Sequence, residues 1–257
     1  MQRLRPLALA ALAWLAVAIP AVLHPGPALA GNAKAPVVVE LFTSQGCNSC
    51  PPADVVLADL TGRHDVITLS YHVNYWDYLG WKDTFATPQT TQRQRDYAKF
   101  LNERTIYTPQ IVIDGKTHTI GSRKDEVMAG VATAAQAHAA KTGKMPLPLV
   151  VMEKRPDGRL MLRVAAAKAQ DVAVILVRYD TRREVAIERG ENRGKTFTYH
   201  NVVRDIRTLA SWNGQALEME LDPQDLWRDG RDGCAVLLQD TRSGQIIAAN
   251  RLEKRGS

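Results

Sequence analysis

The feature that most constrains this chain is a short apolar segment that leads directly into a pair of closely spaced cysteines. Five of the six residues in the segment 37–42 are apolar. Such a run predicts a strand that is buried on both faces, as strands are in a parallel sheet. The polar segment 43–46 predicts a turn, and Cys47 and Cys50 follow it as a C-x-x-C pair. The cysteines are therefore expected at the end of a buried strand.

A helix is predicted to begin immediately after the pair. Pro51 and Pro52 fit only the first turn of a helix, and apolar residues continue on one helical face up to a Thr-Gly stop at 61–62. Cys47 then lies at or just before the helix N-terminus, where unpaired N–H groups and the helix dipole stabilise a thiolate. Because the thiolate is the attacking species in disulfide exchange, we expect Cys47 to attack and Cys50, one turn later, to resolve the mixed disulfide.

A third cysteine, Cys234, leaves several pairings open. An odd number of cysteines cannot form a purely structural disulfide framework. We interpret Cys234 as a buried core cysteine, because it precedes the apolar segment 235–238. The alternatives are a stable structural disulfide between Cys47 and Cys50, or a long-range disulfide from Cys234 to one of them. A zinc site needs four ligands, and the chain has no second C-x-x-C or H-x-x-x-H motif, so no metal site is predicted.

A second signal lies downstream, where a proline opens a short apolar strand. Thr108 and Pro109 precede the strand predicted at 111–113, and an Asp-Gly turn leads into a second strand at 116–120. Together with the C-x-x-C context, this position favours a cis peptide bond before Pro109. An ordinary trans proline at a sheet edge is the alternative.

The order of predicted elements in residues 36–140 resembles the thioredoxin fold. In that superfamily the proline that opens the strand is cis and packs against the C-x-x-C pair, and Thr108-Pro109 matches this pattern. The resemblance implies that these two residues present the backbone of the substrate. Three segments resemble more closely a family of bacterial secreted thioredoxin-like proteins that is catalogued as a domain of unknown function: 40–54, 72–83 and 190–205. One departure is the Asn-Ser dipeptide between the cysteines, which differs from Gly-Pro in thioredoxin and from Pro-His in strong oxidants. The redox potential therefore cannot be assigned by analogy.

An aromatic-rich insertion at 74–106 follows the strand predicted at 66–73. It places four large aromatic residues within seven positions of one another. Because it emerges at the same edge of the sheet as the cysteines, where ligands bind in open α/β sheets, we expect Trp76, Asp77 and Trp81 to shape substrate access. The alternative is a loop whose aromatic residues form a small core of their own.

Two further features of this region carry predictions. His72 is a candidate for tuning Cys47 or binding a metal, although a lone histidine is more often only hydrogen-bonded. Residues 88–106 predict an amphipathic helix, and we interpret its arginines as a solvent-exposed face: Arg93, Arg95 and Arg104.

The chain after a linker at 142–146 predicts only β-structure. Seven to nine short strands, separated by turn residues, indicate a sandwich-like layer over 146–257. The overall fold class is thus an α/β thioredoxin-like domain at 31–142 followed by an all-β sandwich-like domain. The polar segment 190–205 reads as a long hairpin loop. It could alternatively close over the cysteines and bring Arg193 or His200 to the disulfide.

The first thirty residues predict a signal peptide. A basic start at 2–5, an apolar run at 7–23 and small residues at Ala28 and Ala30 fit cleavage before Gly31. This predicts export by the general secretory route to the periplasm or beyond, with no membrane association after cleavage. An uncleaved anchor is the alternative.

The net charge and the cysteines together limit the classes of function that this chain can have. Lys plus Arg is 33 and Asp plus Glu is 27, and loss of Arg3 and Arg5 leaves 31 − 27 = +4, too mild to indicate a nucleic-acid partner. We expect a periplasmic thiol–disulfide oxidoreductase that needs no bound cofactor, acts on a protein or small-thiol client, and is recycled by a redox partner that the sequence does not identify. The alternatives are a thiolate-based Cu(I)- or client-binding protein and a structural disulfide without turnover.

Overall fold

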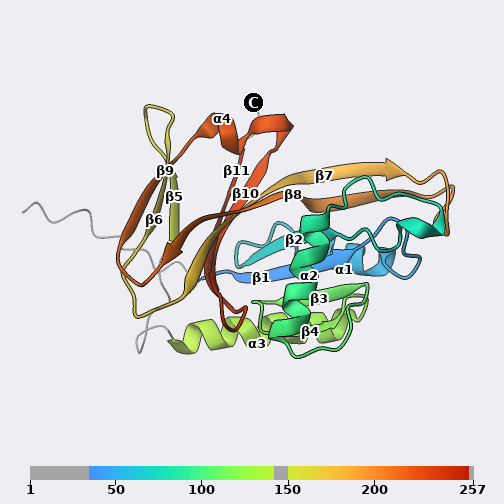
Figure 1. Ribbon diagram of the computed structural model, residues 1–257, viewed down its shortest axis with the longest axis horizontal. Helices are drawn as coiled ribbons and strands as arrows, with labels where there is room; N and C mark the ends of the chain where they lie inside the picture. The colour runs from blue at the N-terminus through green and yellow to red at the C-terminus, as the bar shows by residue number, and fades with distance from the viewer. Residues whose placement is uncertain (1–34, 142–149, 255–257) are drawn as a thin grey trace, which may run out of the picture. The chain divides into compact units, whose positions relative to one another are not determined.

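The computed structural model describes residues 35–141 and 150–254, and these described residues belong to one compact unit. The predicted signal peptide, its cleavage site and the whole of the predicted linker at 142–146 lie outside the described residues. The described strands form an eight-stranded mixed sheet and a three-stranded antiparallel sheet (Figure 1). The eight-stranded sheet has the order β11-β10-β7-β8-β2-β1-β3-β4, and the smaller sheet has the order β5-β6-β9.

The first half of the chain supplies one end of the large sheet and three helices. Strand β1 is parallel to β2 and antiparallel to β3, and β3 forms a hairpin with β4. Every residue of β1 and β2 is buried, as the apolar run predicted. The elements are β1 (Val37–Thr43), α1 (Pro51–Leu60), β2 (Val66–His72), the short 3-10 helix η1 (Asp77–Leu79), α2 (Pro88–Phe100), β3 (Gln110–Ile113), β4 (Thr117–Ile120) and α3 (Lys124–Lys141).

Two apolar cores lie on opposite faces of this part of the sheet, because successive strand side chains point to opposite faces. Val37, Val39 and Leu41 pack with α1 and α3. Val38 and Phe42 pack on the other face with Tyr97 of α2 and with residues of β7 and β10. The sheet is therefore covered on both sides at the strand that leads to the cysteines.

The second half of the chain extends the same sheet. Strands β7 and β8 form a long hairpin, and β8 joins β2 in parallel at Ser70 and Val202. The elements are β5 (Val150–Lys154), β6 (Leu160–Val164), β7 (Val172–Ala186), β8 (Thr196–Trp212), β9 (Leu217–Leu221), α4 (Pro223–Leu226), η2 (Arg228–Gly230), β10 (Gly233–Asp240) and β11 (Ile246–Glu253). The three-stranded sheet shares an apolar core with β7, β10 and β11.

This arrangement differs from the separate sandwich-like layer that the sequence predicted. The second half does supply two packed sheets, but its larger sheet is continuous with that of the first half. Strands β7 and β8 are also long, with 15 and 17 residues, because they extend past the sandwich to the edge where the cysteines lie. A pattern of short strands cannot reveal this continuity, since the β2–β8 contact joins residues far apart in the chain.

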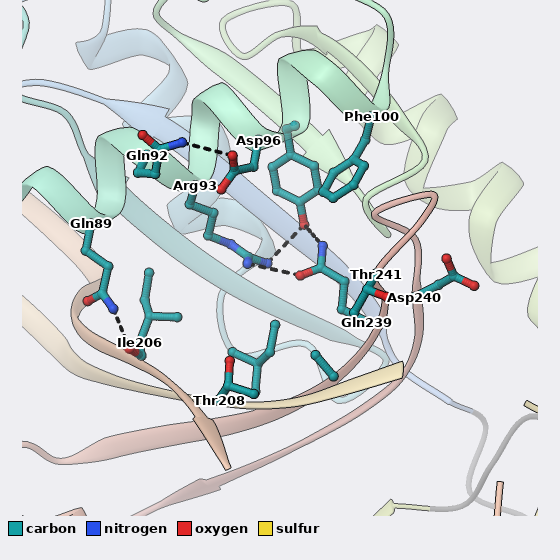
Figure 2. Close-up of a pocket in the computed structure, with 13 residues that line it drawn as sticks. Gln89, Gln92, Arg93, Asp96, Phe100, Ile206, Thr208, Gln239, Asp240 and Thr241 are labelled. Atoms are coloured by element: carbon teal, nitrogen blue, oxygen red, sulfur yellow. Dashed lines mark hydrogen bonds between the residues drawn. The ribbon is translucent and has the colours of Figure 1, made fainter. Parts of the chain in front are cut away.

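The prediction of a solvent-exposed arginine face on α2 is wrong for Arg93. Its side chain is 9% exposed, and its Nε donates to Oε1 of Glu40 in β1 at 2.6 Å. The hydroxyl of Tyr97 also donates to Glu40. Arg93 Nη1 donates to Gln239 (Figure 2). A buried carboxylate requires a paired cation, and Glu40 is fully buried within β1. Arg93 therefore faces the sheet, where a pocket of about 340 Å³ opens beside it between α2 and the strands β7, β8 and β10.

Within the described ranges, none of the helices has the length and apolar character needed to cross a membrane.

Candidate functional site

The two cysteines form a disulfide in the turn between β1 and α1. Cys50 occupies the N-cap position of α1, and its carbonyl accepts from the N–H groups of Ala53 and Asp54. Cys47 is 3% exposed and Cys50 is fully buried. Asn48 and Ser49 between them are exposed. An attacking sulfur can therefore approach the disulfide only from the Cys47 side.

Two hydroxyl groups flank the sulfur of Cys47. Thr108 Oγ1 donates to Cys47 Sγ at 3.4 Å, and Ser49 Oγ lies at the same distance. The Thr108–Pro109 peptide bond is cis, as predicted. Trp76 Nε1 donates to Thr108 Oγ1 at 2.7 Å. The structure thus brings Thr108 and Trp76 together beside Cys47, and Pro109 directly follows Thr108.

Asp77 and Trp81 support the site from farther away. Trp81 Nε1 donates to Gln45 Oε1 at 2.8 Å, and Asp77 Oδ1 accepts from the backbone N–H of Asp83 at 3.1 Å. Trp81 therefore links the insertion to the turn before Cys47, and Asp77 holds the insertion together at Asp83. Tyr78, which the sequence analysis did not single out, is 76% exposed and stacks on Trp76. It leaves an aromatic surface open beside the disulfide.

His72 is a buried, hydrogen-bonded residue behind the turn. Its Nδ1 lies 2.8 Å from Asp83 Oδ2, and neither side chain is exposed. The same carboxylate accepts from the N–H groups of Gln45 and Phe85. Although burial acts to raise it, the pKa of Asp83 lies below its usual value because His72 and these N–H donors stabilise the carboxylate. The hydrogen bonds of the His72 side chain thus lead to the cysteine turn through Asp83 and Gln45.

Asp54 is a site residue that the sequence analysis missed. It lies four residues after Cys50 on α1, and residues with this spacing share one helix face. Burial raises the pKa of Asp54 to about 7, while the charge of His72 and a hydrogen bond from Thr43 act to lower it. Asp54 Oδ1 and His72 Nε2 are both buried, and neither has a hydrogen-bond partner among the described residues. The spacing from Cys50 on an otherwise apolar helix face was the available signal.

Asn192 is the second residue that the sequence analysis missed. It is buried in the turn between β7 and β8, and its Nδ2 donates to the carbonyls of Gln45 and Cys47, each at 3.0 Å. Lys195 Nζ donates to its Oδ1. The segment 190–205 does reach the disulfide, but through Asn192. Arg193 is exposed, and His200 lies within β8 opposite Arg182.

Cys234 is a free, fully buried cysteine, which confirms its interpretation as a core residue. Burial raises the pKa of its thiol to about 12, so the thiolate that reacts in exchange is strongly disfavoured there. Across residues 35–141 and 150–254, no three or more His, Cys, Asp or Glu side chains are grouped to hold a metal ion.

The comparisons with known proteins identify a family and two similar structures. A crystal structure of protein AGR_C_4864 from Agrobacterium tumefaciens is 32% identical, covers 86% of this chain and 95% of its own, and superposes with a TM-score of 0.72. HBP35 of Porphyromonas gingivalis has a TM-score of 0.53 over 87% of this chain and 76% of its own, but at 14% identity it shares the fold alone. No curated protein matches. The model of the family "Protein of unknown function (DUF1223)" matches residues 38–239, and the chain belongs to this family.

Proposed function

We propose that the protein is a thioredoxin-like thiol–disulfide oxidoreductase of the periplasm or the extracellular space. One observation carries the proposal: the Cys47–Cys50 disulfide precedes a helix N-terminus, with the Thr108 hydroxyl donating to the outer sulfur. A helix N-terminus and hydrogen-bond donors both favour a thiolate over a thiol. The exported location rests on the signal-like sequence of residues 1–30.

Thiol–disulfide exchange proceeds in two steps. In the reducing direction, the Cys47 thiolate attacks a client disulfide, forms a mixed disulfide, and releases one client sulfur as a thiolate. Cys50 then loses its proton and attacks Cys47 Sγ, which releases the second client sulfur and closes the Cys47–Cys50 disulfide. Two electrons pass from the cysteine pair to the client. A dithiol partner reverses the sequence to recycle the pair, and the oxidising direction runs the same steps backwards.

Asp54 is the group that accepts the proton of Cys50 in this scheme. It follows Cys50 by one helical turn and has a pKa of about 7, so it is available as a base at neutral pH. The client is a protein or small-molecule thiol or disulfide that reaches the site from the Cys47 side, beside Trp76 and Tyr78.

The reduction potential of the Cys47–Cys50 pair tests the proposal. The protein carrying Cys234→Ala is equilibrated with glutathione buffers, and the oxidised fraction is read by mass after thiol alkylation. A value between about −120 and −270 mV, the range of known exchange catalysts, supports turnover. A value below about −300 mV is typical of structural disulfides and would refute the enzymatic proposal. Titration of the reduced protein with Cu(I) distinguishes the carrier alternative, which requires stoichiometric binding that is lost in Cys47→Ser.

A further inference from the structure

Three side chains form a chain of hydrogen bonds that ends on Cys47. Trp76 Nε1 donates to Thr108 Oγ1 at 2.7 Å, and Thr108 Oγ1 donates to Cys47 Sγ at 3.4 Å. An indole nitrogen is only a donor, whereas a threonine hydroxyl has one proton to give and lone pairs to accept. Trp76 therefore occupies a lone pair of Thr108 and leaves its proton for the sulfur.

The backbone and Cβ of Trp76 pack against the cysteine turn, and two aromatic rings lie next to its indole. A side chain added at Gly46 would lie 3.3 Å from the Trp76 carbonyl and 3.4 Å from Trp76 Cβ, so the cysteine turn packs closely against Trp76. The ring centroids of Tyr75 and Tyr78 lie 5.8 and 6.3 Å from the ring centroid of Trp76. Thr108 lies two residues before β3, which is paired with β1. Trp76 and Thr108, which together form a hydrogen-bond relay to Cys47, are therefore both part of packed structure.

We propose that Trp76 is a positioning residue that aims the Thr108 hydroxyl at Cys47 and thereby stabilises the Cys47 thiolate in the reduced pair. The inference rests on the proposed exchange function. A hydrogen bond to a charged acceptor is stronger than one to a neutral acceptor, and donors in series strengthen one another in a medium of low dielectric constant. The relay is thus weak at a disulfide sulfur and strong at a thiolate, so it favours the reduced, attacking state.

Ser49 provides a matched comparison within the same site. Its hydroxyl also lies 3.4 Å from Cys47 Sγ. Ser49 is exposed, whereas Trp76 and Thr108 are partly buried. Water competes for an exposed hydroxyl, and no indole donor fixes its direction. Loss of the Ser49 hydroxyl should therefore change the thiolate far less than loss of the Thr108 hydroxyl.

The test measures the ionisation of Cys47 in the reduced protein, by the ultraviolet absorbance of the thiolate against pH, in a Cys234→Ala background. Trp76→Phe keeps an aromatic ring but removes the N–H donor, and it should weaken the acid ionisation of Cys47 about three- to tenfold. Thr108→Val should have at least the same effect, while Thr108→Ser and Ser49→Ala stay close to the parent. In the Thr108→Val background, Trp76→Phe should add nothing.

Two results would overturn the proposal. One is an unchanged Cys47 ionisation in Trp76→Phe. The other is an equal shift from Trp76→Phe with and without the Thr108 hydroxyl, which would show that the ring acts by packing. If Trp76→Phe does not fold, Thr108→Val and Thr108→Ser still test the proposal. Equal ionisation of Cys47 in these two variants would show that the Thr108 hydroxyl does not stabilise the thiolate. Measuring the ionisation of Cys47 requires no catalytic turnover. A reduction potential below about −300 mV would refute the proposed enzymatic function, but it would not change the result of the ionisation test.

Discussion

Asp54 illustrates how a single position changes the chemistry of an ordinary residue. Within the described part of the chain, one oxygen of its carboxyl is buried and has no hydrogen-bond partner, and burial raises its pKa from 3.8 to about 7. The folded state therefore binds a proton more tightly than the unfolded state between these two values. Stability must fall as pH rises through this window, and the full cost is present above about pH 7.

Asp54→Asn should remove this cost, because the amide keeps the shape of the side chain but does not ionise. We expect the variant to be more stable than the parent by about 2 kcal/mol at pH 8 and nearly equal to it at pH 4. The residue as a whole is half-buried, so we expect less than the full value that the pKa difference implies. Denaturant unfolding at the two pH values measures the difference. A stability gap that does not depend on pH would show that Asp54 is not the titrating group.

The same variant should slow the second step of exchange. Without a proton acceptor one helical turn after Cys50, the mixed disulfide on Cys47 should persist, and its fraction in an acid-quenched reaction should rise several-fold at pH 7. Intact mass after quenching measures that fraction. Asp59→Asn on the exposed face of α1 is the matched control and should behave like the parent. No accumulation in Asp54→Asn would remove Asp54 from the mechanism.

At the scale of the element, the β7–β8 hairpin reaches the cysteine turn through Asn192. Its amide holds two carbonyls that flank Gly46, and only a donor can satisfy both of them. Gly190 of the same turn packs against Leu79 and Trp81 of the aromatic insertion. The hairpin therefore fixes both the disulfide turn and the insertion beside it.

Asn192→Asp should be destabilising, because a carboxylate would face two carbonyl oxygens and leave them without a donor. We expect a loss of about 2–3 kcal/mol in the free energy of unfolding and faster amide hydrogen exchange in residues 44–47. Arg193→Ala, which changes the exposed neighbour in the same turn, is the control and should be close to neutral. Equal stability of the two variants would mean that the carbonyls are satisfied without Asn192.

Local patterns predicted the elements well and their long-range partners poorly. The strand, turn and helix around the cysteines follow from apolar spacing and from two prolines, and the structure has them at those positions. Asn192 lies 145 residues from Cys47, and the buried position of Arg93 depends on Glu40 in a distant strand. Periodicity reports only which face of an element is apolar. It carries no information about which distant polar group will need a partner.

At the scale of the whole molecule, the junction of β2 with β8 joins the two halves of the chain. The apolar core on the α2 side of the sheet draws residues from β1 and β2 and from β7 and β10. A chain limited to residues 31–141 would expose the edge of β2 together with one side of this core. Exposed edges and apolar surface lead to aggregation.

We therefore expect the 31–141 fragment to aggregate or to lack fixed tertiary packing, while 31–257 unfolds in one transition. Size-exclusion chromatography and near-ultraviolet circular dichroism measure the two properties. The Cys47→Ser, Cys50→Ser form of both chains controls for disulfide errors. A monomeric fragment with cooperative unfolding would show that the first half is an independent domain, as its sequence pattern alone predicted.

The distance along the chain between Cys47 and Asn192 also sets an order of assembly. Synthesis runs at about 5–20 residues per second, so Asn192, which lies 145 positions after Cys47, appears on the order of ten seconds later. During that interval the nascent chain carries both cysteines without the amide that later secures their turn. An oxidising enzyme that meets the chain as it emerges would find these thiols far more open than they are in the finished molecule, where Cys47 is 3% exposed. The first Cys47–Cys50 disulfide would then form before Asn192 is in place.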